Sequence, residues 1–373
     1  MLDIFADLGK CDNQLHPQFR HLRDSSGYKP ARGAVRDILA TFSDPDGNFC
    51  EQFQSTGFDA RTFELYLHAL FVEAGFRIER PSPSPDFLLT KDGLTVAVEA
   101  VTSNPTDGAP YRVDGPAYTP AELERLLFDE IPIRLGSPLF SKRKKAYWKQ
   151  PNVKGRPFII AIEAFHGPGS LNVSSEPLAR YLYGAEVAWT RNADGTLAIS
   201  QRAVPSHTLN GKTIESGMFF LPEAENLAGV LFANAGTVAK FQRMGQQGAH
   251  YDPELRVLRF GSIYDEDPRA VLPKTFAYEV RPGAPWIETW SDGATLFHNP
   301  TAKIPLPADW FGTAVESFLD RDGRATHYLA PSPFQSMTHI ARGWSDAGVA
   351  MMLRTVQERM HLERAKAEAQ GWR

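Results

Sequence analysis

Cysteine is scarce in this sequence of 373 residues, which excludes the folds that depend on it. Only Cys11 and Cys50 are present, and they form neither a CxxC pair nor a zinc-ligand spacing. A disulfide scaffold and a cysteine-rich zinc site are therefore excluded, and a reducing compartment is favoured. The chain is long enough to bury a large core without such cross-links. We expect a globular protein with two free thiols.

Long apolar runs and glycine-rich phosphate loops are also lacking. No apolar run approaches the length of a membrane span, and the first ten residues carry two acids without a basic region before an apolar one. We therefore expect a cytoplasmic location and no membrane partner. No GxGxxG motif is present, and Gly211-Lys212-Thr213 is not part of a complete GxxxxGK(S/T) phosphate loop because residue 206 is serine, which argues against a nucleotide-hydrolysing motor.

Acids are missing from one strongly basic segment. Residues 134–156 contain eight Lys or Arg and no Asp or Glu, although the net charge of the chain is -4. Such a segment can contact phosphates even in an acidic protein, whereas a charge run is more often a solvated helix face. We name Arg143, Lys144, Lys149 and Lys154 as candidate nucleic-acid contacts.

The apolar pattern predicts regular elements from residue 59 onward. Helical spacing from 59 to 75 predicts a helix, with Asp59 as a cap and Gly75 at its end. Three short strands are predicted at 77–80, 86–90 and 94–101, the last two joined as a hairpin by the turn pair Asp-Gly. A capping box at 119–122 begins a helical region that we expect to be interrupted near residue 136 and to continue to 148, and 157–165 is a predicted buried strand.

This order of helix, three strands, helix and strand predicts an α/β (α+β) fold with a central mixed sheet flanked by helices. We divide the chain into a polar lead-in at 1–57 with one short helix near 34–41, a core at 58–166, and a large elaboration at 167–373. The elaboration carries predicted strands at 187–202, 229–233, 256–263 and 275–280 and a helix at 344–369.

Three acids in the core can carry chemistry. Glu64 lies at the border of the helix's apolar stripe, Asp86 follows Pro85 at the start of the hairpin, and Glu99 lies inside VAVEAV. A carboxylate with only apolar neighbours is costly to bury unless it is paired or bound to a metal. Together with the carbonyl of Ala100, these carboxylates would form an oxygen-rich site suited to Mg²⁺ or Mn²⁺.

Each acid also has a purely structural interpretation. Glu64 could pair with His68 or with a basic neighbour. Asp86 could begin a strand after proline, and Glu99 could lie on an edge strand facing water.

Pro85-Asp86, a hairpin, and Glu99-Ala100-Val101, preceded by the helix of Glu64 and followed by helix and strand, resemble the core of the PD-(D/E)XK restriction-endonuclease-like nuclease superfamily. The resemblance covers residues 59–165, under a third of the chain. It implies a metal-dependent nuclease in which Glu64, Asp86 and Glu99 bind Mg²⁺ or Mn²⁺. It further implies a nucleic-acid partner, DNA in preference to RNA, and a role in defence against foreign DNA.

Val101 departs from this pattern because it occupies the position of the motif lysine. The positive charge must then come from another element, or the protein binds nucleic acid or a protein partner without cleaving it. Lys142, Lys145 and Lys149 follow i, i+3 and i+7 spacing, which would place them on one helix face. We expect Lys142 or Lys145 to replace the lysine. Self-association of the chain stays open.

A second polar segment, at 234–237, follows the predicted strand GVLFA and precedes a helix with Lys240 and Arg243. Its main-chain N–H groups could bind a phosphate. Helix capping explains the same segment more simply.

Overall fold

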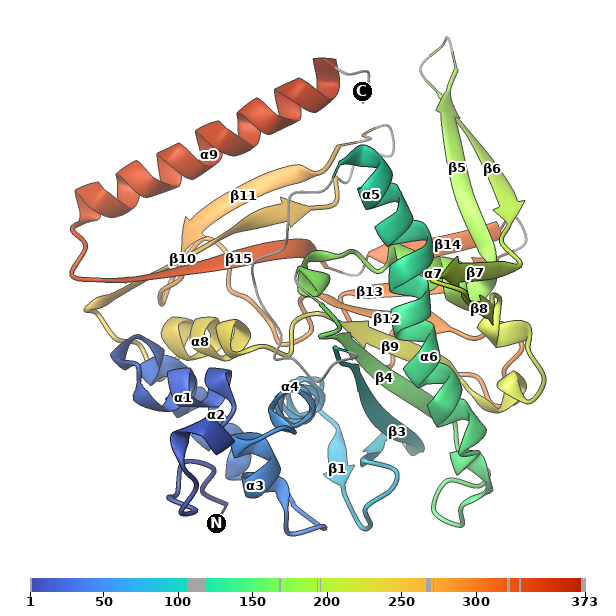
Figure 1. The fold of residues 1–373 in the computed structure, drawn as a ribbon, viewed down its shortest axis with the longest axis horizontal. Coiled ribbons are helices and arrows are strands. Elements are labelled where there is room, and N and C mark those ends of the chain that lie inside the picture. Colours follow the sequence, from blue (N-terminus) through green and yellow to red (C-terminus); the bar gives the residue numbers. More distant parts are fainter. Residues whose placement is uncertain are drawn as a thin grey trace.

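The computed structural model of the protein describes residues 2–105, 119–167, 169–192, 194, 196–265, 270, 272–320, 323–328 and 330–369. An eight-stranded mixed sheet forms its centre, with helices on both faces (Figure 1). The predicted α/β class and the flanked mixed sheet are thus confirmed. No described helix is both long enough and apolar enough to cross a membrane.

The strand order of the central sheet is β1-β2-β3-β4-β9-β12-β13-β14. Strands β3, β4 and β9 are parallel to one another, as are β12 and β13, and the other neighbours are antiparallel. The bounds are β1 Arg77–Glu79, β2 Phe87–Lys91, β3 Leu94–Ser103, β4 Phe158–Ala164, β9 Gly229–Ala233, β12 Ala294–His298, β13 Val315–Asp320 and β14 Gly323–Tyr328. The second half of the chain therefore extends the same sheet.

The two faces of the sheet are covered by different helices, and β3 shows which residues face each side. Val96 and Val98 pack into the core formed with α4 (Phe58–Glu73), whereas Ala97 and Val101 pack into the core formed with α6 (Ile131–Lys144). This alternation is the period of two expected of a strand buried on both faces.

The helical region after β3 is α5 (Pro120–Arg125), a π-helical turn (Leu126–Glu130) and α6, followed after β4 by α7 (Glu176–Tyr183). The predicted capping box at 119–122 is present. The predicted interruption near Gly136 is wrong, because Gly136 lies inside α6. A Cβ there would approach the ring of Tyr181 to 2.7 Å, so the glycine permits close packing against α7.

The lead-in is more structured than the sequence predicts. It contains α1 (Pro17–Asp24), α2 (Lys29–Leu39) and α3 (Phe49–Gln54) in place of one short helix. Phe19, Phe49 and Phe53 are buried in the core shared with α4, and α2 packs against α8 (Val238–Gln247). Asp59 does not cap α4, which begins one residue before it.

The remaining strands form smaller sheets beside the centre. Strands β11, β10 and β15 make a three-stranded sheet that α9 crosses on its outer side (Figure 1). The run predicted as one strand at 187–202 is the hairpin β5/β6, and β7/β8 forms another hairpin. The bounds are β5 Ala185–Arg191, β6 Leu197–Ala203, β7 Ser206–Leu209, β8 Lys212–Glu215, β10 Leu255–Ile263, β11 Lys274–Glu279, β15 Pro333–Arg342 and α9 Asp346–Ala369.

Candidate active site

The hairpin of β2 and β3 places Asp86 beside Glu99. Phe87 pairs with Val98, so Asp86, immediately before β2, and Glu99 are the next residues along the two antiparallel segments. Directly opposed residues of antiparallel strands share one face of a sheet. The Asp86 carboxylate also accepts the main-chain N–H of Ala100 at 2.7 Å. The two acids are therefore close to one another, and Glu99 lies on the face that α6 covers.

Glu64 reaches this region from α4, on the other side of the sheet. Its side chain is buried, and its two oxygens accept from Arg61 at 2.6 Å and from Arg80 at 2.8 Å. His68, one turn further along α4, bonds to Thr41 and not to Glu64. Glu64 thus pairs with basic neighbours, which is one of the two structural interpretations given for it above.

The negative charges of both other carboxylates affect the pKa of Asp86. Its pKa is raised to about 8, first by burial and then by the negative charges of Glu64 and Glu99. The Ala100 N–H and Arg80 lower this pKa only in part. The pKa of Asp86 therefore depends on the charges of both Glu64 and Glu99.

Glu99 is buried on a central strand, which excludes the interpretation as an edge residue facing water. Its Oε1 accepts from Lys142 Nζ at 2.5 Å and from the hydroxyl of Tyr147 at 2.8 Å. Its Oε2 is buried and has no hydrogen-bond partner among the described residues. Burial and the charge of Glu99 raise the pKa of Tyr147, so this phenol stays protonated and donates.

Lys142 brings a positive charge to the face of β3 that carries Glu99 and Val101. Glu99 and Val101 lie two positions apart on β3 and so point to the same side, where α6 carries Lys142. The ammonium group thus reaches the carboxylate from the covering helix.

Lys145 does not contact Glu99 in the described part of the chain, whereas Lys142 does. The helix ends at Lys144, and Ala146 adopts a left-handed conformation with φ of 51°, which turns the chain away. The predicted single helix face of Lys142, Lys145 and Lys149 is therefore wrong. The ammonium groups of Lys142 and Lys145 lie 5.9 Å and 6.0 Å from the centre of the Tyr147 ring, but in the described part of the chain it is Lys142 that contacts Glu99.

The four candidate nucleic-acid contacts lie in different surroundings. Arg143 donates to the carbonyl of Pro222 at 2.8 Å, and Lys149 lies 3.5 Å from Glu223. Lys144 is exposed above the ring of Phe140, and Lys154 is exposed in the turn before β4. Lys144 and Lys154 are thus exposed and are not held by an acid or a carbonyl group in the described part of the chain.

The donor groups decide how well a divalent cation fits this site. Within the described ranges, no three Asp, Glu, His or Cys side chains are placed to hold a metal ion together. Both oxygens of Glu64 are held by arginines, so the expected three-carboxylate cage is not assembled. Asp86 and Glu99 do fit a cation, because Glu99 Oε2 is a buried carboxylate oxygen with no hydrogen-bond partner in the described part of the chain and the neighbouring charges disfavour ionisation of Asp86.

Three residues of the site were missed by the sequence analysis. Arg61 lies at i-3 from Glu64, a spacing that signals a helical ion pair. Arg80 stacks over the rings of Phe42 and Phe87, and no local spacing points to this long-range contact. Tyr147 is buried against Glu99, and its position after the basic run gives no sequence signal for this contact.

Comparison with protein-family models, with curated proteins and with solved structures finds no match to this chain.

Proposed function

We propose that this protein is a metal-dependent nuclease that hydrolyses phosphodiester bonds of nucleic acid, DNA in preference to RNA. The observation that carries the proposal is the 2.5 Å contact between Lys142 Nζ and Glu99 Oε1, on the face where Val101 replaces the motif lysine. Asp86 opposite Glu99 completes the pattern of two hairpin acids and one cation.

The side chains suggest a division of labour. Asp86 and Glu99 would hold Mg²⁺ or Mn²⁺, which activates water and neutralises charge on a phosphodiester. Lys142 would orient the attacking water and offset the negative charge that develops on the phosphate. Tyr147 donates to Glu99 and fixes the carboxylate's orientation.

One observation favours a second candidate, a nuclease-like fold that binds nucleic acid or a protein partner without cleaving. Three acids face three basic residues here, because Glu64 pairs with Arg61 and Arg80 and Glu99 pairs with Lys142. Paired buried charges need no metal to compensate them.

A cleavage assay separates the two candidates. We expect purified protein to cut plasmid or single-stranded DNA in Mn²⁺ or Mg²⁺ and to be inactive in EDTA, with RNA as the comparison substrate. Mn²⁺ titration by calorimetry should show stoichiometric binding. Metal binding without cleavage of any substrate, or neither binding nor cleavage, would support the second candidate.

The substitution Lys144→Ala should weaken DNA binding without lowering the maximal cleavage rate. Lys144 is exposed and lies outside the carboxylate cluster formed by Glu64, Asp86 and Glu99. Its ammonium can therefore contribute to DNA binding only by contacting phosphate. Loss of one phosphate contact should reduce the slope of log K against log salt by about 0.9. Fluorescence anisotropy at several salt concentrations measures this slope.

The matched control is Lys366→Ala, which removes the same charge from exposed α9. An equal effect of both variants would show that only the overall charge of the protein matters.

A further inference from the structure

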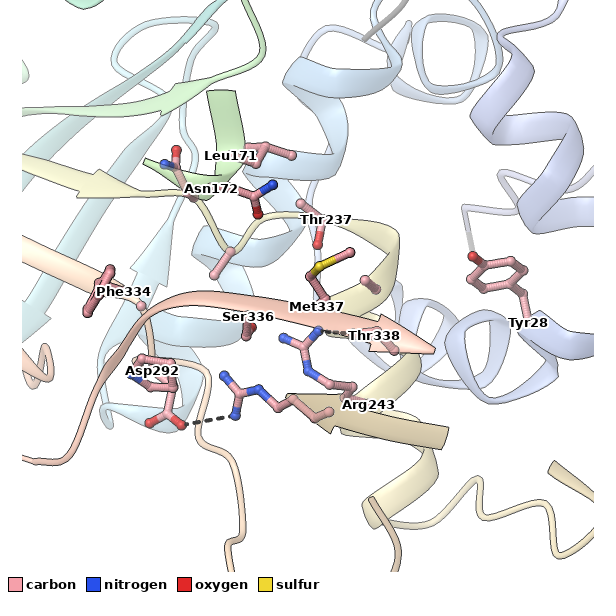
Figure 2. Close-up of a pocket in the computed structure, with 16 residues that line it drawn as sticks. Tyr28, Leu171, Asn172, Thr237, Arg243, Asp292, Phe334, Ser336, Met337 and Thr338 are labelled. Atoms are coloured by element: carbon pink, nitrogen blue, oxygen red, sulfur yellow. Dashed lines mark hydrogen bonds and ion pairs between the residues drawn. The ribbon is translucent and has the colours of Figure 1, made fainter. Parts of the chain in front are cut away.

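A cavity of about 350 Å³ lies beside α8, and its lining includes none of the residues of the carboxylate cluster. Asn172 and Asn234, which follow β4 and β9 in the chain, contribute to its wall, as does β15 (Figure 2). The carboxyl ends of parallel strands are where open α/β sheets generally bind ligands. The position of the cavity is thus one that commonly serves ligand binding.

Three residues of the lining, Arg243, Arg259 and Asp292, belong to a buried charge network. Glu288 contacts Lys240 and Arg243 at 2.7 Å and Arg259 at 3.2 Å, and all four side chains are at most 5% exposed. Asp292 Oδ2 lies 3.7 Å from Arg259 Nη1. These five groups comprise three cations and two acids.

The network therefore carries one positive charge in excess. Glu73 is also close enough to influence Lys240 electrostatically, but it is exposed and its carboxylate accepts the main-chain N–H of Trp290. A buried excess charge is costly unless a counter-ion compensates it. An anion in the cavity would provide that compensation.

Two buried polar atoms of the lining residues lack hydrogen-bond partners within the described ranges. They are Nε of Arg259, which needs an acceptor, and Oδ2 of Asp292, which needs a donor. Buried groups of this kind are normally satisfied by a ligand or water. Arg243, whose Nη1 donates to Thr338, contributes a second guanidinium to the wall (Figure 2). A ligand that suits both atoms must combine an anionic group with hydroxyl or amino donors.

The segment at 234–237 is not the anion site that the sequence suggested. The Gly236 N–H is donated to buried Glu163 at 2.8 Å, and Thr237 caps α8 by accepting from the Lys240 N–H. The arginine side chains, and not these main-chain groups, supply the positive charge of the cavity.

The rest of the wall combines polar residues, among them Ser336 and Thr338, with apolar and aromatic ones. Tyr28 and Phe334 lie on opposite sides of the cavity, and Met337 lies between them (Figure 2). We propose that the cavity binds a nucleoside monophosphate, with the phosphate against Arg243 and Arg259, ribose hydroxyls near Asp292, and the base on the apolar wall. Guanidinium groups bind phosphate through paired hydrogen bonds, and the volume falls in the range of small-molecule pockets.

Calorimetric titration of the full chain with AMP, CMP, GMP and UMP tests this proposal. At least one should bind at least about tenfold more tightly than inorganic phosphate or the matching nucleoside, because the site needs both parts of the ligand. The variant Asn172→Asp places an unfavourable charge in the wall and should weaken binding about tenfold or more. The control Asn13→Asp adds the same charge at an exposed position outside the cavity and should leave affinity unchanged.

The outcomes separate this site from the proposed nuclease site. Glu99→Ala should retain nucleotide binding, whatever its effect on cleavage. Failure of all four nucleotides to bind, binding no tighter than that of inorganic phosphate, or an equal loss in Asn13→Asp and Asn172→Asp would overturn the proposal. Circular dichroism of Asn172→Asp should show the native fold, so that weaker binding reports the cavity itself.

Discussion

Replacing Lys142 by methionine should lower the cleavage rate by about 10² to 10⁴ while leaving the affinity for Mn²⁺ unchanged or higher. Among the described side chains, its ammonium is the one cation in contact with Glu99, so its loss removes the group that would orient water and offset phosphate charge. Removing a positive charge beside two carboxylates cannot repel a metal ion. Single-turnover cleavage and calorimetric Mn²⁺ titration measure the two quantities separately.

The matched control is Lys145→Met, three residues along the chain. Lys145 is exposed, and its ammonium lies near the Tyr147 ring and not at Glu99. The cleavage rate of Lys145→Met should therefore differ from that of the parent protein by no more than about twofold. If Lys142→Met cleaves as fast as the parent protein, the migrated-lysine mechanism fails. A parallel loss in both variants would instead indicate that the segment binds DNA.

The elements that sequence reasoning predicted well are those fixed by local pattern. The helix around Glu64, the hairpin of β2 and β3 and the strand β4 each have a strong apolar period or a clear turn pair. Strands β12, β13 and β14 were not predicted, although they complete the central sheet. β12 pairs with β9, a distant segment, and a local pattern does not encode that contact. β13 and β14 pair with each other as consecutive antiparallel strands, and this local pairing was missed.

The candidate site shows the same division between local and distant information. The opposition of Asp86 and Glu99 follows from the hairpin register, which the turn pair Asp-Gly makes predictable. The partners of Glu64 were harder to predict. Arg80 reaches it from beyond β1, so the number of charges in the site could not be counted from spacing alone.

The sequence narrowed the lysine near Glu99 to Lys142 or Lys145 but did not identify which one, for a related reason. Its helix could be predicted from the capping box, but the choice between Lys142 and Lys145 depends on which ammonium contacts Glu99, a residue on a distant strand. The left-handed Ala146 separates Lys149 from the helix, and alanine gives no sequence signal for such a conformation.

The variant Asp86→Asn should be more stable than the parent protein at alkaline pH in the absence of metal. The pKa of Asp86 is about 8 in the folded protein, against 3.8 for an unperturbed aspartate, so the folded state binds more protons between these values. The stability of the parent protein should therefore fall as pH rises from about 4 to about 8. Asparagine does not ionise and can still accept the Ala100 N–H, so the variant avoids this loss.

We expect the free energy of unfolding of Asp86→Asn to exceed that of the parent by a few kcal/mol at pH 8.5, and by much less at pH 5. Urea titrations in EDTA at the two pH values measure the difference. The control Asp7→Asn also replaces a carboxylate that accepts a main-chain N–H, but an exposed one, and should change stability by less than about 0.5 kcal/mol.

Repeating the titrations in Mg²⁺ adds a test of the metal site, because a cation that needs ionised Asp86 should stabilise the parent protein and not the variant. A variant that gains nothing at pH 8.5 would show that Asp86 is not destabilised by its acidic neighbours, and an equal effect of Mg²⁺ on both proteins would exclude Asp86 as a metal ligand.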